Sequence, residues 1–184
     1  APALCNRIDR NTGGIVIAAK TAEGLRVMNQ KIRDRELKKY YLCIVHGTLP
    51  RPAGRLEGYI LKDEAKKQVT VSSRPRPGAK TAVTLYETLA VRNGLSLVRC
   101  QLITGRTHQI RAQFAAAGHP LLGDGKYGSE RQNKRYGRSY QALYSYRLEF
   151  CFTTDAGALA PLDGQQFQVE QVDFVTEYFP GFSL

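Results

Sequence analysis

The sequence predicts an α+β domain built on a mixed, mainly antiparallel central sheet with flanking helices. Strand-like runs and helical runs are mixed along the chain without the regular βαβ alternation that a parallel sheet requires. Asn93-Gly94 joins two alternating runs, which is typical of an antiparallel hairpin. The length of 184 residues suits one domain whose core needs neither disulfides nor metals.

The first quarter of the chain is expected to hold a strand, a helix and a second strand. Residues 13–20 indicate a short buried strand, and a helix is expected over residues 22–34 with Thr21 as its N-cap. Residues 38–47 are apolar on both faces, which predicts a central strand. One face of that strand is expected to carry Tyr41, Cys43 and Val45.

The middle of the chain is expected to add four strands and a helix. The helix covers residues 107–117 and ends at Gly118. On this helix His108 and Arg111 share a stripe that is expected to project away from the core. The four strands are expected at residues 56–61, 68–72, 82–89 and 95–103.

Residues 129–140 are basic with interleaved tyrosines and are expected to form an exposed loop before a last strand at residues 142–150. Such a loop suits RNA, because cations meet phosphates and the rings of Tyr136 and Tyr140 can stack on unpaired bases. The alternative is a solvated loop whose charges serve solubility. The cations are Arg131, Lys134, Arg135 and Arg138.

The charge balance points to a polyanionic partner. Lys and Arg number 27 against 16 Asp and Glu, a net charge of +11. Nucleic acid is the first expectation and an anionic membrane surface the second. No apolar run approaches the length of a membrane-spanning helix. The four cysteines form no CxxC pair and the three histidines no ligand spacing, so we expect no metal and a reducing cytoplasm.

Asp9 stands between Arg7 and Arg10 in a segment rich in Asn, Thr and Gly. One interpretation is a simple turn, because all of these residue types favour turns. The other is a carboxylate that its cationic neighbours hold ionised and ready to act as a nucleophile.

Residues 104–111 also allow more than one interpretation. They fit a basic helix start on the surface, an anion site at a helix N-terminus helped by Arg106, or an Arg111 that reaches a carboxylate elsewhere. His108 by itself does not distinguish among these three interpretations. Tyr41, in the expected central strand, fits either a core position or a site position.

Four segments carry recognisable motifs. Asn-Arg-Ile-Asp-Arg-Asn-Thr-Gly-Gly occupies residues 6–14, and Lys-Tyr-Tyr occupies residues 39–41. Leu-Ile-Thr-Gly-Arg-Thr-His-Gln-Ile-Arg spans residues 102–111, and His-Pro-Leu-Leu-Gly-Asp-Gly-Lys-Tyr-Gly spans residues 119–128. In order and separation these segments strongly resemble the motifs of the RluA-type pseudouridine synthases. The resemblance covers nearly the whole chain.

The resemblance implies an enzyme that flips a uridine of ribosomal or transfer RNA out of its stack and isomerises it to pseudouridine. It implies that Asp9 attacks the flipped uridine, that Tyr41 stacks against the base and that Arg111 pairs with Asp9. Arg7 would enter the space that the base leaves. Further substrate contacts are expected from Arg106, Thr107 and His108. RNA is the expected partner, and no cofactor, metal or energy source is expected.

Residues 1–184 are therefore expected to form the catalytic domain of such an enzyme, monomeric, without an S4 domain and lacking an N-terminal segment that the family normally has. The sequence departs from the family pattern where Tyr144 stands at a position that is often His. Three further departures lie in the first motif, namely Asn6 for His, Ile8 for Leu and Gly13 for Ser.

Two other classes of function compete with this one. The first is an RNA-binding module that keeps the fold without catalysis. The second is a glycosidase-like hydrolase, which would need two carboxylates flanking the scissile bond. Only Asp9 stands out as such a carboxylate among the motifs.

Overall fold

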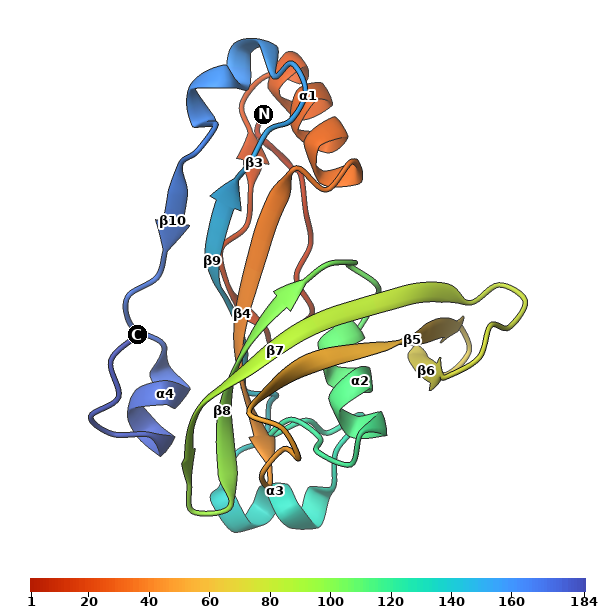
Figure 1. Cartoon of the computed structure of the whole chain (residues 1–184), viewed down its shortest axis with the longest axis vertical. Coiled ribbons are helices and arrows are strands. Elements are labelled where there is room, and N and C mark those ends of the chain that lie inside the picture. The colour runs from red at the N-terminus through yellow and green to blue at the C-terminus, as the bar shows by residue number, and fades with distance from the viewer.

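The computed structural model describes all 184 residues and has a strongly twisted eight-stranded sheet as its framework. Along its main path the strand order is β10-β9-β4-β8-β7-β5-β6, and β2 pairs with the edge of β9 (Figure 1). Only the β2–β9 pairing is parallel, which confirms the predicted mixed, mainly antiparallel α+β fold. No helix is both long and apolar enough to cross a membrane.

The bounds of the elements follow chain order. The strands are β1 (Ala3–Leu4), β2 (Gly13–Gly14), β3 (Ala18–Ala19), β4 (Leu37–His46), β5 (Ala53–Asp63), β6 (Gln68–Ser72), β7 (Lys80–Arg92), β8 (Leu95–Leu102), β9 (Leu143–Phe150) and β10 (Gln166–Gln168). The helices are α1 (Ala22–Arg33), α2 (Gln109–Ala116), α3 (Glu130–Tyr136), the 3-10 helix η1 (Gly157–Leu162) and α4 (Asp173–Tyr178).

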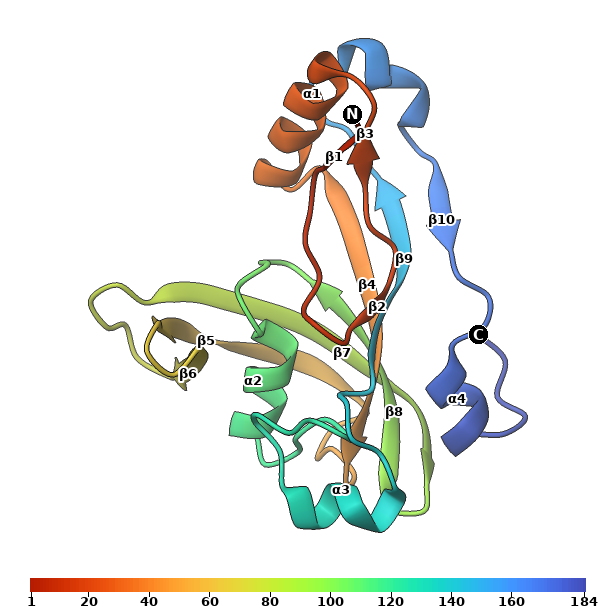
Figure 2. The ribbon, with the colours of Figure 1, turned by 180° about the vertical axis from the view of Figure 1, so that it is seen from behind.

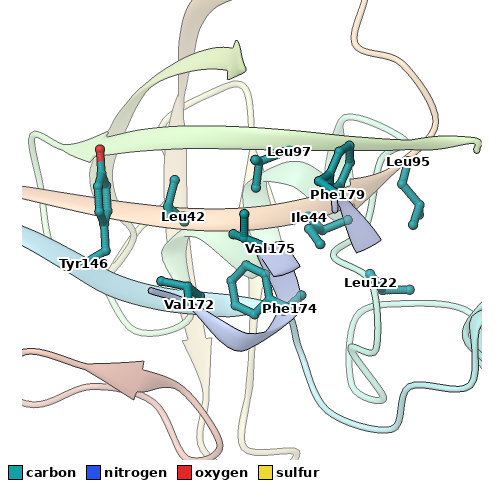
Figure 3. Close-up of a cluster of buried hydrophobic side chains, with 11 residues drawn as sticks. Leu42, Ile44, Leu95, Leu97, Leu122, Tyr146, Val172, Phe174, Val175 and Phe179 are labelled. Atoms are coloured by element: carbon teal, nitrogen blue, oxygen red, sulfur yellow. The ribbon is translucent and has the colours of Figure 1, made fainter. Parts of the chain in front are cut away.

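Strand β4 is the central strand, as predicted, and its two faces belong to two different cores. It lies between β8 and β9, and Leu42 to Val45 are completely buried. Tyr41, Cys43 and Val45 share one face, as expected, and this face packs against α2. On the other face Leu42 and Ile44 pack with α4 (Figure 3). The sheet is therefore the middle layer between α2 and α4.

Local signals placed several elements correctly. The Thr21 side chain accepts a hydrogen bond from the Gly24 N–H at 3.0 Å and caps α1. Asn93 and Gly94 have φ angles of 54° and 75°, as the tight turn of a hairpin requires. Gly118, with φ of 87°, follows α2. These positions were predictable because each depends only on neighbours in sequence.

Two predicted segments differ from the structure. The expected strand at residues 13–20 is two short strands, β2 and β3, because Gly14 has φ of 120° and interrupts the extended run. The expected exposed loop at residues 129–140 contains helix α3, which Ser129 caps and Gly137 ends in the left-handed conformation. Helix α4 was not predicted, because its six residues are too few to show a helical period.

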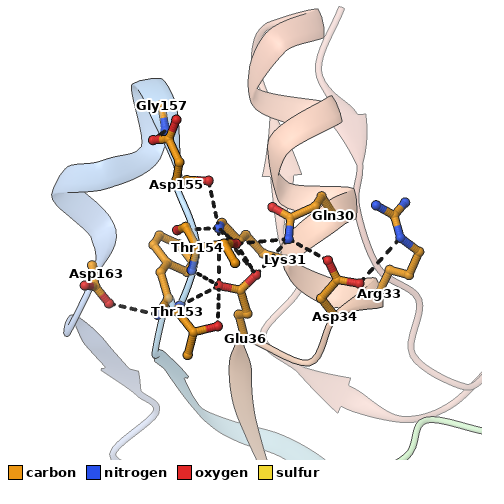
Figure 4. Close-up of polar contacts among 11 residues, drawn as sticks. Gln30, Lys31, Arg33, Asp34, Glu36, Thr153, Thr154, Asp155, Gly157 and Asp163 are labelled. Carbon is orange, nitrogen blue, oxygen red and sulfur yellow. Dashed lines mark hydrogen bonds and ion pairs between the residues drawn. The ribbon is translucent and has the colours of Figure 1, made fainter.

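A buried charge pair ties the end of α1 to the segment that follows β9 (Figure 4). Lys31 is fully buried and donates hydrogen bonds to the carbonyls of Thr154 and Asp155 at 2.8 and 2.9 Å. Glu36 lies 3.3 Å from the Lys31 ammonium and accepts hydrogen bonds from the backbone N–H groups of Thr153 and Thr154. Desolvation opposes ionisation, but these hydrogen bonds hold the pKa of Glu36 well below its ordinary value.

Glu36→Gln is expected to lower stability most at neutral pH. A carboxylate with a depressed pKa in the folded state stabilises the fold above its unfolded pKa of about 4.3, and this contribution fades as the pH falls below that value. Urea unfolding measures the free energy of unfolding of the Glu36→Gln variant and of the unsubstituted protein. The difference between the two should be large at pH 7 and smaller at pH 3. The control is Glu57→Gln, which removes an exposed partner of Arg55. An equal gap at both pH values would contradict this account.

Candidate active site

Asp9 lies in a turn that the chain makes between β1 and β2. This segment descends from β1, turns beside β9 and climbs back to β3 (Figure 2). The Thr12 N–H donates to the Asp9 carbonyl at 3.0 Å, and Asn11 takes the left-handed conformation with φ of 66°. The turn interpretation of this motif is therefore correct for the backbone. The Asp9 side chain does not stabilise the turn, because its carboxylate accepts no hydrogen bond from the turn.

The turn is fixed to the sheet by contacts that the motif itself does not contain. Buried Gln141, just before β9, donates to the Arg10 carbonyl at 2.6 Å and to the Thr12 hydroxyl at 3.2 Å. Gly14 lies so close to β9 that a Cβ there would be 2.2 Å from the Ser145 carbonyl oxygen. Sequence reasoning missed Gln141, because a single glutamine outside a motif gives no signal.

Arg111 connects Asp9 to a second carboxylate. Its Nε and Nη2 donate to both carboxylate oxygens of Asp124 at 2.7 and 3.0 Å, and its Nη1 lies 3.8 Å from Asp9 Oδ2. The Arg111 side chain is 7% exposed and Asp124 is fully buried. The prediction that Arg111 projects away from the core is therefore wrong, because Asp124 supplies the countercharge that allows burial.

Asp124 is positioned by the chain around it. Its Oδ1 accepts hydrogen bonds from the N–H groups of Lys126 and Tyr127, and its carbonyl accepts one from the Asn133 amide at 3.1 Å. Burial opposes ionisation, yet the hydrogen bond from Arg111 lowers the pKa of Asp124 below its ordinary value. The buried Asn133 of α3 explains why residues 129–140 form a docked helix rather than a free loop.

Tyr41 faces the Asp9 turn from β4. Beside it β9 has a bulge, because Tyr40 pairs with Arg147 whereas Tyr41 pairs with Ser145. Burial raises the pKa of the Tyr41 hydroxyl; the nearby Ser145 side chain opposes this rise, and the charge of Asp9 adds to it. Tyr41 therefore remains a neutral phenol over the physiological range.

Asp9 and Tyr41 line one small cavity of about 90 Å³. Its other polar lining residues are Arg7, Thr12, Lys39, Arg106 and Gln109. Its apolar side chains are Ile8, Leu102, Ile110 and Leu143. A larger, mainly apolar cavity of about 800 Å³ lies beside α1 and β3, but Asp9 does not line it. The smaller cavity is the candidate active site, because it joins a free carboxylate to cations and a buried phenol.

The remaining predicted substrate-binding residues divide into two groups. Arg7 is exposed at the cavity, and Arg106 donates from its Nε to the Thr81 carbonyl at 2.7 Å. Thr107 is exposed and His108 does not line the cavity. His108 Nδ1 lies 2.7 Å from the Tyr127 hydroxyl, and burial lowers the pKa of His108 although the charge of Asp9 opposes this. No three His, Cys, Asp or Glu side chains gather in a way that could hold a metal ion.

The sequence profile of a family described as RNA pseudouridylate synthase matches residues 1–116. The chain belongs to this family. An uncharacterized RNA pseudouridine synthase of Mycoplasma genitalium is 38% identical over 154 residues, which cover 81% of this chain and 47% of that protein. Ribosomal large subunit pseudouridine synthase C of Escherichia coli is 32% identical over 156 residues, covering 82% and 48%. The chain thus spans about half the length of the curated relatives it matches.

The fold of the family is seen in solved structures as well. The human RNA pseudouridylate synthase domain containing 4 protein matches with a TM-score of 0.74 at 23% identity, over 94% of this chain and 72% of that one.

Two of the departures from the RluA-type pattern, Gly13 and Tyr144, lie against each other in the structure. Gly13 pairs with Tyr144, and a Cβ at Gly13 would lie 2.8 Å from the Tyr144 ring. The small residue at one position makes room for the large residue at the other.

Asp124→Asn is expected to destabilise the protein by about 3 kcal/mol, because it leaves the buried Arg111 guanidinium without a countercharge. Equilibrium denaturation by urea measures this loss. The control is Asp34→Asn, which removes an exposed partner of Arg33 and should change stability by less than about 1 kcal/mol. Equal losses in the two variants would show that the buried pair does not hold this part of the fold.

Proposed function

We propose that this chain is the catalytic part of an RNA pseudouridine synthase that converts a uridine in ribosomal RNA to pseudouridine. One observation carries the proposal: the Asp9 carboxylate, free of structural hydrogen bonds, lines a cavity beside Tyr41 and lies 3.8 Å from Arg111. Ribosomal RNA rather than transfer RNA is favoured by the ribosomal large subunit name of the relative from Escherichia coli.

The proposed reaction uses these residues in sequence. The target uridine leaves its stack and enters the cavity, while Arg7 occupies the space that the base vacates. Asp9 attacks the uridine, with its charge balanced by Arg111, and Tyr41 packs against the base. A bond from Asp9 to ribose C1′ forms as the bond from C1′ to uracil N1 breaks. The ring then turns, and the bond from Asp9 to C1′ breaks as C5 bonds to C1′, so the Asp9 carboxylate is released. C5 then loses its proton and N1 gains one, so the product is an isomer of the substrate.

Asp9→Asn is expected to abolish turnover while RNA binding survives or tightens, because the change keeps the size of the side chain and removes a negative charge from an RNA-facing cavity. The substrate is total RNA from cells that lack the gene for this protein. Pseudouridine is mapped after incubation with each purified protein, and binding is measured in parallel. The control is Asp63→Asn, at the end of β5, where the carboxylate accepts a hydrogen bond from the Lys66 N–H of the following turn.

Near-normal turnover by folded Asp9→Asn protein would overturn the catalytic role. Equal losses of binding and turnover would instead favour the RNA-binding module without catalysis. Arg111→Ala is also expected to reduce turnover, and the double variant is expected to be little worse than Asp9→Asn alone, since the two residues act as one unit.

Removing the exposed cations of α3 is expected to reduce the salt dependence of RNA binding. Arg131, Lys134 and Arg135 are all exposed on this helix. Each lost phosphate contact should lower the slope of log affinity against log salt by about 0.7 to 0.9. The measurement is a binding titration at several salt concentrations with the triple alanine variant. An unchanged slope would show that α3 does not touch RNA.

A further inference from the structure

Lys39 lines the same cavity as Asp9 and Tyr41, yet the reaction proposed above assigns it no task. It lies two residues before Tyr41 on β4, so both side chains are on the same face of the sheet. Its neighbours across β8 and β9 are Leu102 and Leu148. The side chain is half-buried, and its surroundings in the sheet are apolar.

The ammonium of Lys39 has no partner in the protein. It makes no hydrogen bond and no ion pair, whereas buried Lys31 is surrounded by Glu36 and the carbonyls of Thr154 and Asp155. The other eight lysines are exposed. Burial lowers the pKa of Lys39 below its ordinary value. A half-buried cation without a partner is unfavourable in a resting protein and is explained if a ligand supplies the missing acceptor.

We propose that Lys39 is a further catalytic residue of the reaction inferred above, whose ammonium contacts a carbonyl oxygen of the flipped uracil. When the bond from N1 to the ribose breaks with its electron pair left on the ring, the ring becomes an anion. Its charge is shared between nitrogen and the carbonyl oxygens. A fixed cation beside those oxygens stabilises that state more than it stabilises the neutral uridine. Lys39 keeps all of its protons throughout. The negative charge of the ring returns to the Asp9 carboxylate when C5 bonds to the ribose, and the later loss of the C5 proton is balanced by the proton that N1 gains.

A carbonyl oxygen of the uracil fits the position beside the Lys39 ammonium better than a phosphate of the RNA backbone does. Lys39 is half-buried beside Tyr41, the residue proposed to pack against the base, whereas Arg7 is exposed at the same cavity. Phosphates of an RNA chain remain at the surface and are met by exposed cations. A phosphate contact contributes to binding in the ground state, whereas a contact with the uracil anion contributes to the rate. The two can therefore be separated experimentally.

Lys39→Met is the first test, and Lys38→Met is its matched control, because Lys38 is exposed and points to the other face of β4. At saturating RNA, the single-turnover rate of pseudouridine formation should fall by about 100-fold or more in Lys39→Met and stay unchanged in Lys38→Met. RNA affinity and its salt slope should match those of the unmodified protein. A near-normal rate in Lys39→Met, or a slope reduced by about 0.7 with a normal rate, would overturn the proposal.

Chemical rescue separates charge from packing. Lys39→Cys should lose the same activity, and aminoethylation of the new thiol with bromoethylamine rebuilds an ammonium at nearly the same place. The protein without the Lys39→Cys substitution is treated with bromoethylamine as a control, since its own Cys5 and Cys151 are partly exposed and can react. Recovery of at least tenfold supports Lys39, and failure to recover with full aminoethylation opposes it. If the unmodified protein forms no pseudouridine at all, the proposed function fails first, so the two failures are distinguishable.

Discussion

The buried pair between Arg111 and Asp124 is the interaction on which the candidate site depends. Asp124 uses both of its oxygens to hold one edge of the guanidinium, and the remaining nitrogen faces Asp9 at 3.8 Å. Because the guanidinium is planar, its two hydrogen bonds to Asp124 also fix the position of the nitrogen that faces Asp9. Asp124 is in turn held by α3 through Asn133, whose side chain also accepts the Gly123 N–H at 2.8 Å. A helix at the lower end of the molecule therefore supports the centre of the site (Figure 1).

The site is assembled from chain segments that meet only in the folded state. Asp9 comes from a turn near the start, Tyr41 from the central strand and Arg111 from α2. The sheet brings them together, because β4 contributes Tyr41 while β9 receives the Asp9 turn through β2. The bulge in β9 lies beside Tyr41. A rigid sheet holds these groups more accurately than loops alone would.

What could be predicted from the sequence is what depends on near neighbours. The two faces of β4, the Thr21 cap and the Asn93-Gly94 turn all follow from local pattern, and all were confirmed. The burial of Arg111 could not be predicted, because helical periodicity does not reveal a countercharge thirteen residues further along. Helix α3 had local signals in Ser129 and Gly137, but the density of charge favoured a loop. The chemistry was predictable only through resemblance to a family.

The acidic side chains of the protein differ in how fully their oxygens are used. Glu36 and Asp124 accept several hydrogen bonds each and are buried, so their lone pairs are committed to the fold. Asp9 accepts none, is 26% exposed and has one loose ionic contact. It is the only carboxylate lining a cavity that also holds Arg7, Lys39 and Arg106. A nucleophilic carboxylate that acts on a polyanion must keep its oxygens free of structural hydrogen bonds. It also needs cations nearby, because these cations balance the negative charge of the carboxylate and attract the polyanion. A carboxylate that only stabilised the turn would instead accept the backbone N–H groups beside it.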